Sequence, residues 1–176
     1  ELKTRIDLAE PTRKNQIWDV TCSLLPSTMI MADSLWHIKP GSIHYDEETL
    51  TINNIWFDGK DQYIKVNGNA SRKDKSQVIK ASLKDIDLQY LSNVLYMPDI
   101  KLLGIVTAEV EAGQVLHQPI LNAKASAKQF GLNGQALGDV IAASATYNYE
   151  MEQIDLKGTV LNDVMDTTKV VGFVSP

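Results

Sequence analysis

The sequence predicts a mainly β protein, an antiparallel meander with one short helix. Three observations support this. Apolar and polar residues alternate along most of the chain, and the connections between alternating runs are short and either polar or glycine-containing. Only one stretch has helical spacing. Alternation gives each strand one apolar and one polar face, so we expect a half-buried sheet. Strands joined by short turns indicate a meander and not parallel crossover units.

The composition indicates a single globular domain. The chain has 176 residues, of which 44% are hydrophobic and 22% charged, and 17 basic against 22 acidic residues give a charge of −5. Disordered chains carry less apolar and more unbalanced charge. The mild acidity and scattered Lys and Arg argue against nucleic acid as a partner and against electrostatic docking on anionic lipid. We expect one segment over residues 1–176, an internal piece of a longer chain, in which targeting information cannot be read.

The first alternating run, residues 18–24, predicts a strand with Trp18, Val20, Cys22 and Leu24 on one face. Cys22 is the only cysteine, which excludes an internal disulfide and a cysteine-based zinc site. We interpret it as a small core residue. Further alternating runs cover residues 63–70, 79–83, 106–112, 121–128 and 154–160, and connections are expected at residues 39–42, 58–61, 71–75 and 131–134.

One stretch has apolar residues three and four positions apart, which is typical of a helix. It includes Leu88, Leu91 and Leu95, and it predicts a helix over about residues 87–95. Asp85 or Asp87 is available as its N-cap, and Pro98 ends the helical pattern. A single short helix can plug one end of the sheet or cover part of its apolar face.

Many residues expected on the apolar faces are Ala or Gly. Ala123, Ala125 and Ala127 form one such run, and Ala143 and Ala145 form another. Two packed sheets are usually filled by larger side chains across a gap of about 10 Å. Either these small residues lie opposite tryptophans or the helix, or the sheet curls around an apolar concave face that is not filled. The second reading predicts a groove for an apolar ligand.

No group of residues predicts catalysis, a metal site or a cofactor site. His37 and His44 flank residues 39–42 and would face each other if these residues formed a hairpin turn, but the following residues 46–48 are typical of a solvated hairpin tip. His117 is expected in a loop. There is no phosphate-binding glycine loop and no nucleophile elbow. We therefore expect a protein that is not an enzyme.

Aromatic residues concentrate in the first half of the chain. Trp36, Tyr45, Trp56, Phe57 and Tyr63 either pack in the core or form a stacking platform for sugar. Because they stand beside alternating aliphatic residues, core packing is the favoured interpretation.

Several short motifs follow one another along the chain. Trp36-His-Ile-Lys-Pro-Gly-Ser42 is followed by Leu50-Thr-Ile-Asn-Asn-Ile-Trp-Phe57, and then by Ile64-Lys-Val-Asn-Gly-Asn-Ala-Ser71. Next come Asp87-Leu-Gln-Tyr-Leu91, Leu103-Gly-Ile-Val106, Pro119-Ile-Leu-Asn-Ala123 and Leu137-Gly-Asp139. The order of these motifs resembles the repeating units of TamB-like translocation and assembly proteins of the AsmA superfamily. The resemblance extends from about residue 36 to residue 169 and is clearest between Gly104 and Asp139.

This resemblance implies a taco-like β-groove in the periplasm, part of a protein anchored in the inner membrane. Family members are associated with phospholipid transport to the outer membrane and with outer-membrane protein assembly beside a TamA-type insertase. They have no catalytic residues. The implied partners are therefore phospholipid acyl chains or the strands of outer-membrane proteins, with the insertase contacted through other parts of the full-length chain.

The predicted groove lining consists of apolar residues that alternate with polar ones. It comprises Ile64, Val66, Ile79, Ala81, Val106, Ala108, Val110, Leu121, Ala123, Ala125, Ile141, Ala143, Ala145, Ile154 and Leu156. An acyl chain would gain about 0.8 kcal/mol per buried CH₂ in such a trough.

Two other functions are compatible with the same pattern. Open sheet edges can receive an extended client strand, which would make the chain a scaffolding module. A closed β-sandwich could bind sugar through its aromatic half. Exposed edges and an apolar trough also make a homodimer of the isolated segment an expectation.

Overall fold

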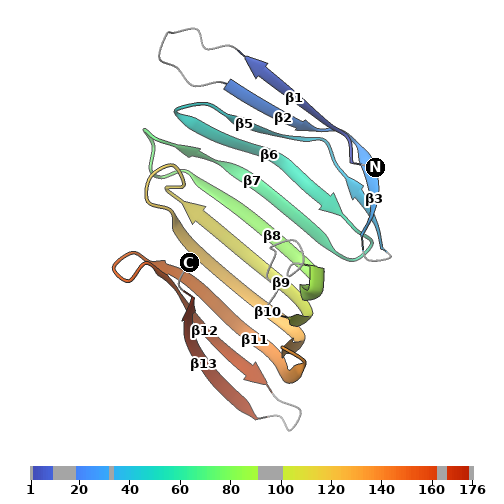
Figure 1. Ribbon diagram of the computed structural model, residues 1–176, viewed down its shortest axis with the longest axis vertical. Coiled ribbons are helices and arrows are strands. Elements are labelled where there is room, and N and C mark those ends of the chain that lie inside the picture. Colours follow the sequence, from blue (N-terminus) through green and yellow to red (C-terminus); the bar gives the residue numbers. More distant parts are fainter. Residues whose placement is uncertain (1, 10–18, 32–33, 91–100, 162–165, 175–176) are drawn as a thin grey trace. The chain divides into compact units, whose positions relative to one another are not determined.

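The computed structural model describes residues 2–9, 19–31, 34–90, 101–161 and 166–174. These residues form a single antiparallel sheet with one short helical turn (Figure 1). Its strands are β1 (Thr4–Ala9), β2 (Asp19–Leu24), β3 (Ser27–Met31), β4 (Ser34–Ile38), β5 (Gly41–Tyr45), β6 (Thr49–Asp58), β7 (Tyr63–Ser71), β8 (Val78–Asp87), β9 (Leu102–Gly113), β10 (Ile120–Leu132), β11 (Gln135–Asn148), β12 (Gln153–Leu161) and β13 (Thr167–Val174).

Strand order follows the chain closely. From β5 onward each strand is hydrogen-bonded to the next one in sequence, and the order ends at β13. This confirms the predicted antiparallel meander. All described strands belong to one hydrogen-bonded sheet, and no second sheet is found among them.

The chain divides into two compact units. The first unit comprises Glu1–Ser82 and Glu111–Ile120, and the second comprises Leu83–Val110 and Leu121–Pro176. Each unit is described separately below.

In the first unit, β4 and β5 lie one after the other along β6. Ile38 pairs with Phe57 of β6, and Ser42 pairs with Asn53 of the same strand. Lys39 and Pro40 thus join two segments that run in the same direction along β6, and they do not reverse the chain. The Lys39 amide also donates to the Trp56 carbonyl of β6, at 2.9 Å. Pro40 has no amide hydrogen, and the regular ladder is interrupted there.

This arrangement corrects the expectation that His37 and His44 face each other across a hairpin. His37 lies opposite Asp58 and Thr28, whereas His44 lies opposite Thr51 and Thr21. A true hairpin tip follows at residues 46–48, as predicted. There the Asp46 carboxylate accepts hydrogen bonds from the Glu48 amide at 2.7 Å and the Thr49 amide at 2.6 Å.

The apolar residues of the first unit line up across the strands. One row runs through Ile6, Cys22, Ile43, Ile52 and Gly68, with a residue from each of β1, β2, β5, β6 and β7. Cys22 thus shares a face with aliphatic side chains as predicted, although it is half-buried and not in a closed core. Trp18, expected on the same face, lies outside the described residues.

The aromatic residues of the first unit divide between the two faces. Trp36 is 2% exposed, and Phe57 pairs with Ile64 and Ile38 on the apolar face. Trp56 instead pairs with Lys65, whose Nζ lies 4.0 Å from the centre of the indole ring. Trp56 is half-buried and lies on the face opposite Phe57, because a bulge between Ile52 and Ile55 shifts the following residues.

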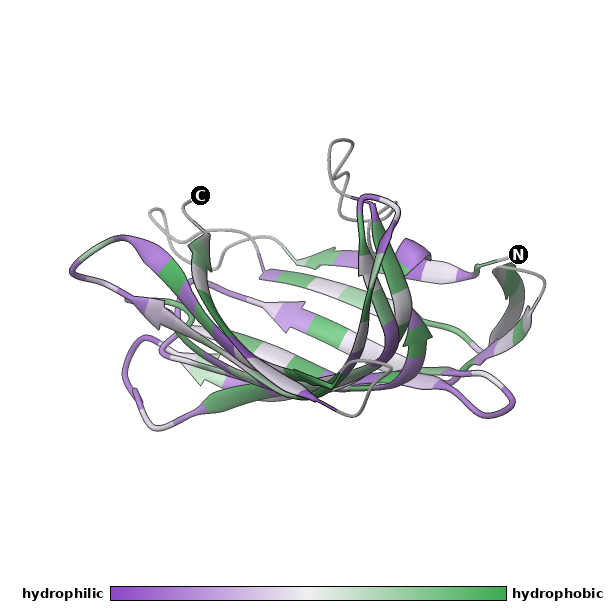
Figure 2. Ribbon diagram, turned by 90° about the horizontal axis from the view of Figure 1, so that it is seen from below, coloured by the Kyte–Doolittle hydropathy of each residue, from purple (hydrophilic) through white to green (hydrophobic). Residues whose placement is uncertain are grey.

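In the second unit, β10, β11, β12 and β13 form consecutive hairpins. Asn133 and Gly134 connect β10 to β11 as a tight turn, with φ angles of 50° and 84°. This confirms the predicted connection near residues 131–134. Figure 2 shows hydrophobic and hydrophilic residues alternating along the strands. Register shifts in the β10–β11 and β11–β12 ladders add local bends and twist.

The predicted helix begins where expected. Residues 88–90 are helical and follow directly after β8. The carboxylate of Asp87 accepts a hydrogen bond from the Gln89 amide at 2.9 Å, as an N-cap does. Leu88 is buried. Residues 91–95, the rest of the predicted helix, lie outside the described residues. No helix among the described residues is long and apolar enough to cross a membrane.

Candidate functional site

The apolar face of the second unit consists largely of small residues arranged in cross-strand rows. Ala125 lies opposite Ala143, which in turn lies opposite Gly158, and Gly158 lies opposite Val170. Paired residues in neighbouring strands project from the same face. Four strands therefore contribute one row that contains two alanines, one glycine and one valine.

A second row runs parallel to the first. It contains Ala123, Ala145, Leu156 and Gly172, again one from each of β10 to β13. The alanines of both rows are half-buried, whereas the residues between them on β10 and β11, such as Lys124 and Ser144, are exposed. The alternation read from the sequence thus corresponds to two chemically different faces in the folded unit.

Nothing among the described residues of the second unit forms a second layer over this apolar face. Apart from residues 88–90, these residues lie in strands of the one sheet or in the connections beside them. The small side chains are therefore not explained by a bulky facing sheet within the unit. Ala127 lies opposite Val140 in a third row. At 8% exposure it is the most buried of the alanines in the predicted runs at residues 123–127 and 143–145.

Ile141 does not follow the alternation. The register shifts between Val140 and Ala142, and Val140 takes the position opposite both Ala127 and Val160. Ile141 falls in the bulge and is 52% exposed. The structure therefore places Val140 in the apolar rows, where the simple period of two had placed Ile141.

The other predicted lining residues of the second unit lie on β9, β10 and β12. Val106 is buried, Ala108, Val110 and Leu121 are half-buried, and Ile154 lies opposite Tyr147. Val160 and Val170 also belong to these rows but were not predicted. Val160 ends the alternating run that begins at Ile154, so the sequence pattern could have indicated it. Val170 lies on β13, where apolar and polar residues do not alternate strictly, so no sequence pattern indicated it.

In the first unit, four predicted lining residues lie on β7 and β8. Ile64 pairs with Phe57 and Val66 pairs with Ile55, so both share a face with aliphatic or aromatic partners. Ile79 and Ala81 are half-buried on β8. This unit presents larger apolar side chains than the second one.

The polar groups around His44 in the first unit lie at and beside the hairpin tip of residues 46–48. Asp46 lies beside His44, whose Nε2 is 3.6 Å from the carboxylate, while Nδ1 of His44 lies 3.3 Å from Asp19. Partial burial raises the pKa of Asp46, but hydrogen bonds from Glu48 and Thr49 and the charge of His44 lower it more, so the net pKa is below the ordinary value. Among the described residues, no three potential ligands cluster in a way that could hold a metal ion.

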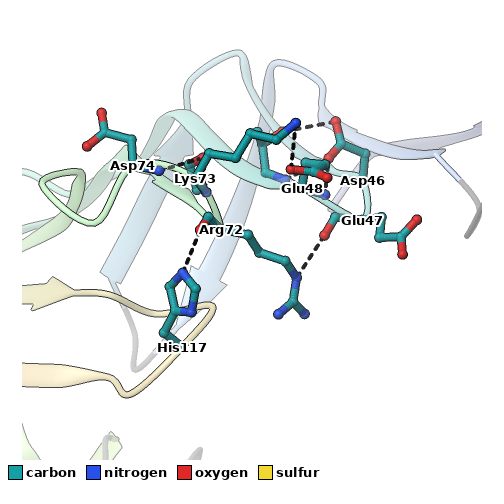
Figure 3. Close-up of polar contacts among 9 residues, drawn as sticks. Asp46, Glu47, Glu48, Arg72, Lys73, Asp74 and His117 are labelled. Atoms are coloured by element: carbon teal, nitrogen blue, oxygen red, sulfur yellow. Dashed lines mark hydrogen bonds and ion pairs between the residues drawn. The ribbon is translucent and has the colours of Figure 1, made fainter.

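Arg72 connects three loops at one end of the first unit (Figure 3). Its Nε donates to the Glu47 carbonyl at 2.9 Å and its Nη1 donates to the Leu116 carbonyl at 3.1 Å. The Arg72 carbonyl in turn lies 2.7 Å from Nε2 of His117. His117 lies in a loop, as predicted, and the hydrogen-bond partner of its ring is a backbone group, so these contacts link the three loops.

Comparison with known proteins found no relative of this chain. No protein-family model, curated protein or solved structure matches the chain significantly. A function is therefore inferred from the register, the burial and the side-chain chemistry, together with the sequence resemblance described above.

Proposed function

We propose that this chain is a periplasmic segment of a TamB-like protein of the AsmA superfamily and that its apolar sheet face binds phospholipid acyl chains. The observation that carries the proposal is the pair of small-residue rows on β10 to β13. These rows leave space along the sheet, and the described part of the unit contains no second sheet that would fill it. The family resemblance supplies the identity of the ligand.

The chemistry of the face suits a chain-like apolar ligand. Along the two rows the side chains are alanine, valine, leucine and glycine, so nothing there donates a hydrogen bond to a specific polar group. An acyl chain would gain about 0.8 kcal/mol for each CH₂ that leaves water. Binding would depend on length and apolarity and not on one atom, which suits transport toward the outer membrane without catalysis.

A matched pair of variants tests the proposal. Ala143→Arg places a charged side chain on the apolar face, whereas Ser144→Arg adds the same charge on the opposite face of the same strand. Native mass spectrometry of protein purified from cells should show bound phospholipid for the wild type and for Ser144→Arg, and at least a tenfold loss for Ala143→Arg. Equal lipid occupancy in both variants would contradict the proposal.

The second candidate function is strand addition by a client protein. The hydrogen-bonded order ends at β13, where Val171 and Phe173 are exposed at 77% and 65%. Such an edge can pair with an extended segment of an outer-membrane protein. This function predicts binding of barrel-derived peptides by a protein that contains no lipid, so the same mass spectra separate the two candidates.

A further inference from the structure

β1 forms an edge of the sheet in the first unit (Figure 1). Within the described part of the chain it is hydrogen-bonded to β2 alone, and all six of its residues are exposed. Ile6 and Leu8 are 65% and 61% exposed, although they lie opposite Cys22 and Val20 on the apolar face of this unit. A strand with one unpaired side and exposed apolar side chains can pair with a further strand.

One backbone hydrogen bond shows which groups of β1 point away from β2. The Leu25 amide, next to β2, donates to the Lys3 carbonyl at 3.0 Å, so the backbone groups of Lys3 point toward the β2 side. In an antiparallel ladder, successive residues direct their backbone groups alternately to the two sides of the strand. The β1–β2 register has no bulge, and the amides and carbonyls of Thr4, Ile6 and Leu8 therefore point to the free edge.

Two opposite charges stand symmetrically about Ile6 on the other face of β1. Arg5 precedes Ile6 and Asp7 follows it, and their side chains form an exposed ion pair of 3.0 Å within one chain. A lone charge on an edge strand opposes self-pairing, whereas a symmetric pair of opposite charges does not. If a second β1 pairs antiparallel with its Ile6 opposite this Ile6, each Arg5 lies opposite the Asp7 of the other copy. The strand is therefore complementary to itself.

The charges also select one register of this pairing. The outward backbone groups recur at every second residue, so neighbouring antiparallel registers are centred on Arg5, Ile6 or Asp7. A register centred on Arg5 opposes two arginines and one centred on Asp7 opposes two aspartates, and like charges directly opposite each other are destabilising. In the register centred on Ile6, Arg5 and Asp7 occupy the positions between the ladder hydrogen bonds, where paired Cα atoms are about 4.5 Å apart and side chains lie closest.

We propose that β1 pairs antiparallel with the β1 strand of a second copy of this chain, about a two-fold axis at Ile6. Two-fold interfaces are the commonest in homo-oligomers. The axis stands perpendicular to the sheet, so the apolar faces of the two first units join, and Ile6 and Leu8 lose exposed apolar area. One short edge strand buries less area than a standard interface, so we expect a weak dimer that depends on concentration. The pairing does not depend on acyl-chain binding.

Two charge-swap variants test this pairing, because each alone should lose a dimer that their mixture recovers. Asp7→Arg makes both charges of β1 positive and Arg5→Asp makes both negative, so like charges oppose each other in either homodimer. Sedimentation velocity at low salt, with protein up to about 0.5 mM, covers the affinities of a small interface and should show a wild-type dimer. Each variant alone should dimerise at least about tenfold more weakly, and an equimolar mixture should return to within about threefold of the wild-type affinity.

Lys169→Glu is the matched control, because it reverses a charge on β13, the strand at the other end of the hydrogen-bonded order. It should leave dimerisation unchanged. A wild type that stays monomeric over the whole concentration range, a mixture that does not recover the dimer, or a dimer lost only in Lys169→Glu would overturn the proposal. The Ala143→Arg variant should dimerise as the wild type does even where it loses phospholipid, so failure of this proposal and failure of the proposed function are distinguishable.

Discussion

Ala125 and Ala143 are direct cross-strand partners in the β10–β11 ladder, and Gly158 continues their row on β12. Three consecutive small residues across a sheet leave a shallow strip free of large side chains. In a packed two-layer protein such a strip would be filled by a facing layer, since voids forfeit dispersion contacts. The described part of the second unit has no such layer. The pairing of Ala125 with Ala143 and Gly158 is therefore the basis for proposing a ligand-binding face.

Glycine is required at position 68 for two separate reasons. Its φ angle is 137°, and a Cβ there would lie 2.8 Å from the Cα of Ile79. We expect Gly68→Ala to lower the free energy of unfolding by about 2–4 kcal/mol in urea denaturation. Gly172→Ala serves as control, because a Cβ at Gly172 meets no atom within 4 Å and should change stability by less than about 1 kcal/mol. Equal losses in both variants would contradict this explanation.

The Asp46 carboxylate should make stability depend on pH. Its pKa is lower in the folded chain than the ordinary value, so it stabilises the fold fully above the unfolded pKa of about 3.9. This contribution is lost as the pH falls through the lowered folded pKa. Asp46→Asn removes the charge, so the wild type should be more stable than the variant at pH 7 and lose most of that advantage near pH 2.5. Urea midpoints at both pH values measure the difference, and an advantage independent of pH would refute the assignment.

Arg72 should hold the loops of the first unit through two separate hydrogen bonds to carbonyl groups. Lysine cannot reproduce both, because its ammonium is a point donor without the planar fork of arginine. Arg72→Lys should therefore cost about 1 kcal/mol of stability and speed amide exchange at His117. As a control, Lys73→Gln removes an exposed ion pair with Glu48 and should cost less than about 0.5 kcal/mol. If amide exchange at His117 is as slow in Arg72→Lys as in the wild type, Arg72 does not hold this loop.

Much of the fold was predictable because period-two alternation is a local property. Val66 and Ala125 could be assigned to apolar faces from their neighbours alone, and the folded register agrees. Bulges are not local in this sense. The register shift at Ile141 depends on how β11 pairs with β12, and the one near Asn54 turns Trp56 toward Lys65. Neither leaves a distinctive residue pattern.

The course of the chain at Pro40 shows a second limit. A Lys-Pro-Gly-Ser sequence is typical of turns, yet here the chain continues along β6 from β4 into β5 without turning back. On the side away from β6, β4 pairs with β3, whereas β5 pairs with β2. The candidate site was predictable to the same extent as the strands. Individual small residues could be named from the sequence, but their grouping into rows required the register.

The most direct test of the proposed function is photo-crosslinking from one strand of the second unit. A photoreactive amino acid at position 143 should label phospholipid in cells, whereas the same group at position 144, on the opposite face of β11, should not. Labelling confined to position 143 is the result that acyl-chain binding by the apolar face predicts. Equal labelling from both positions, or labelling of protein alone, would contradict it.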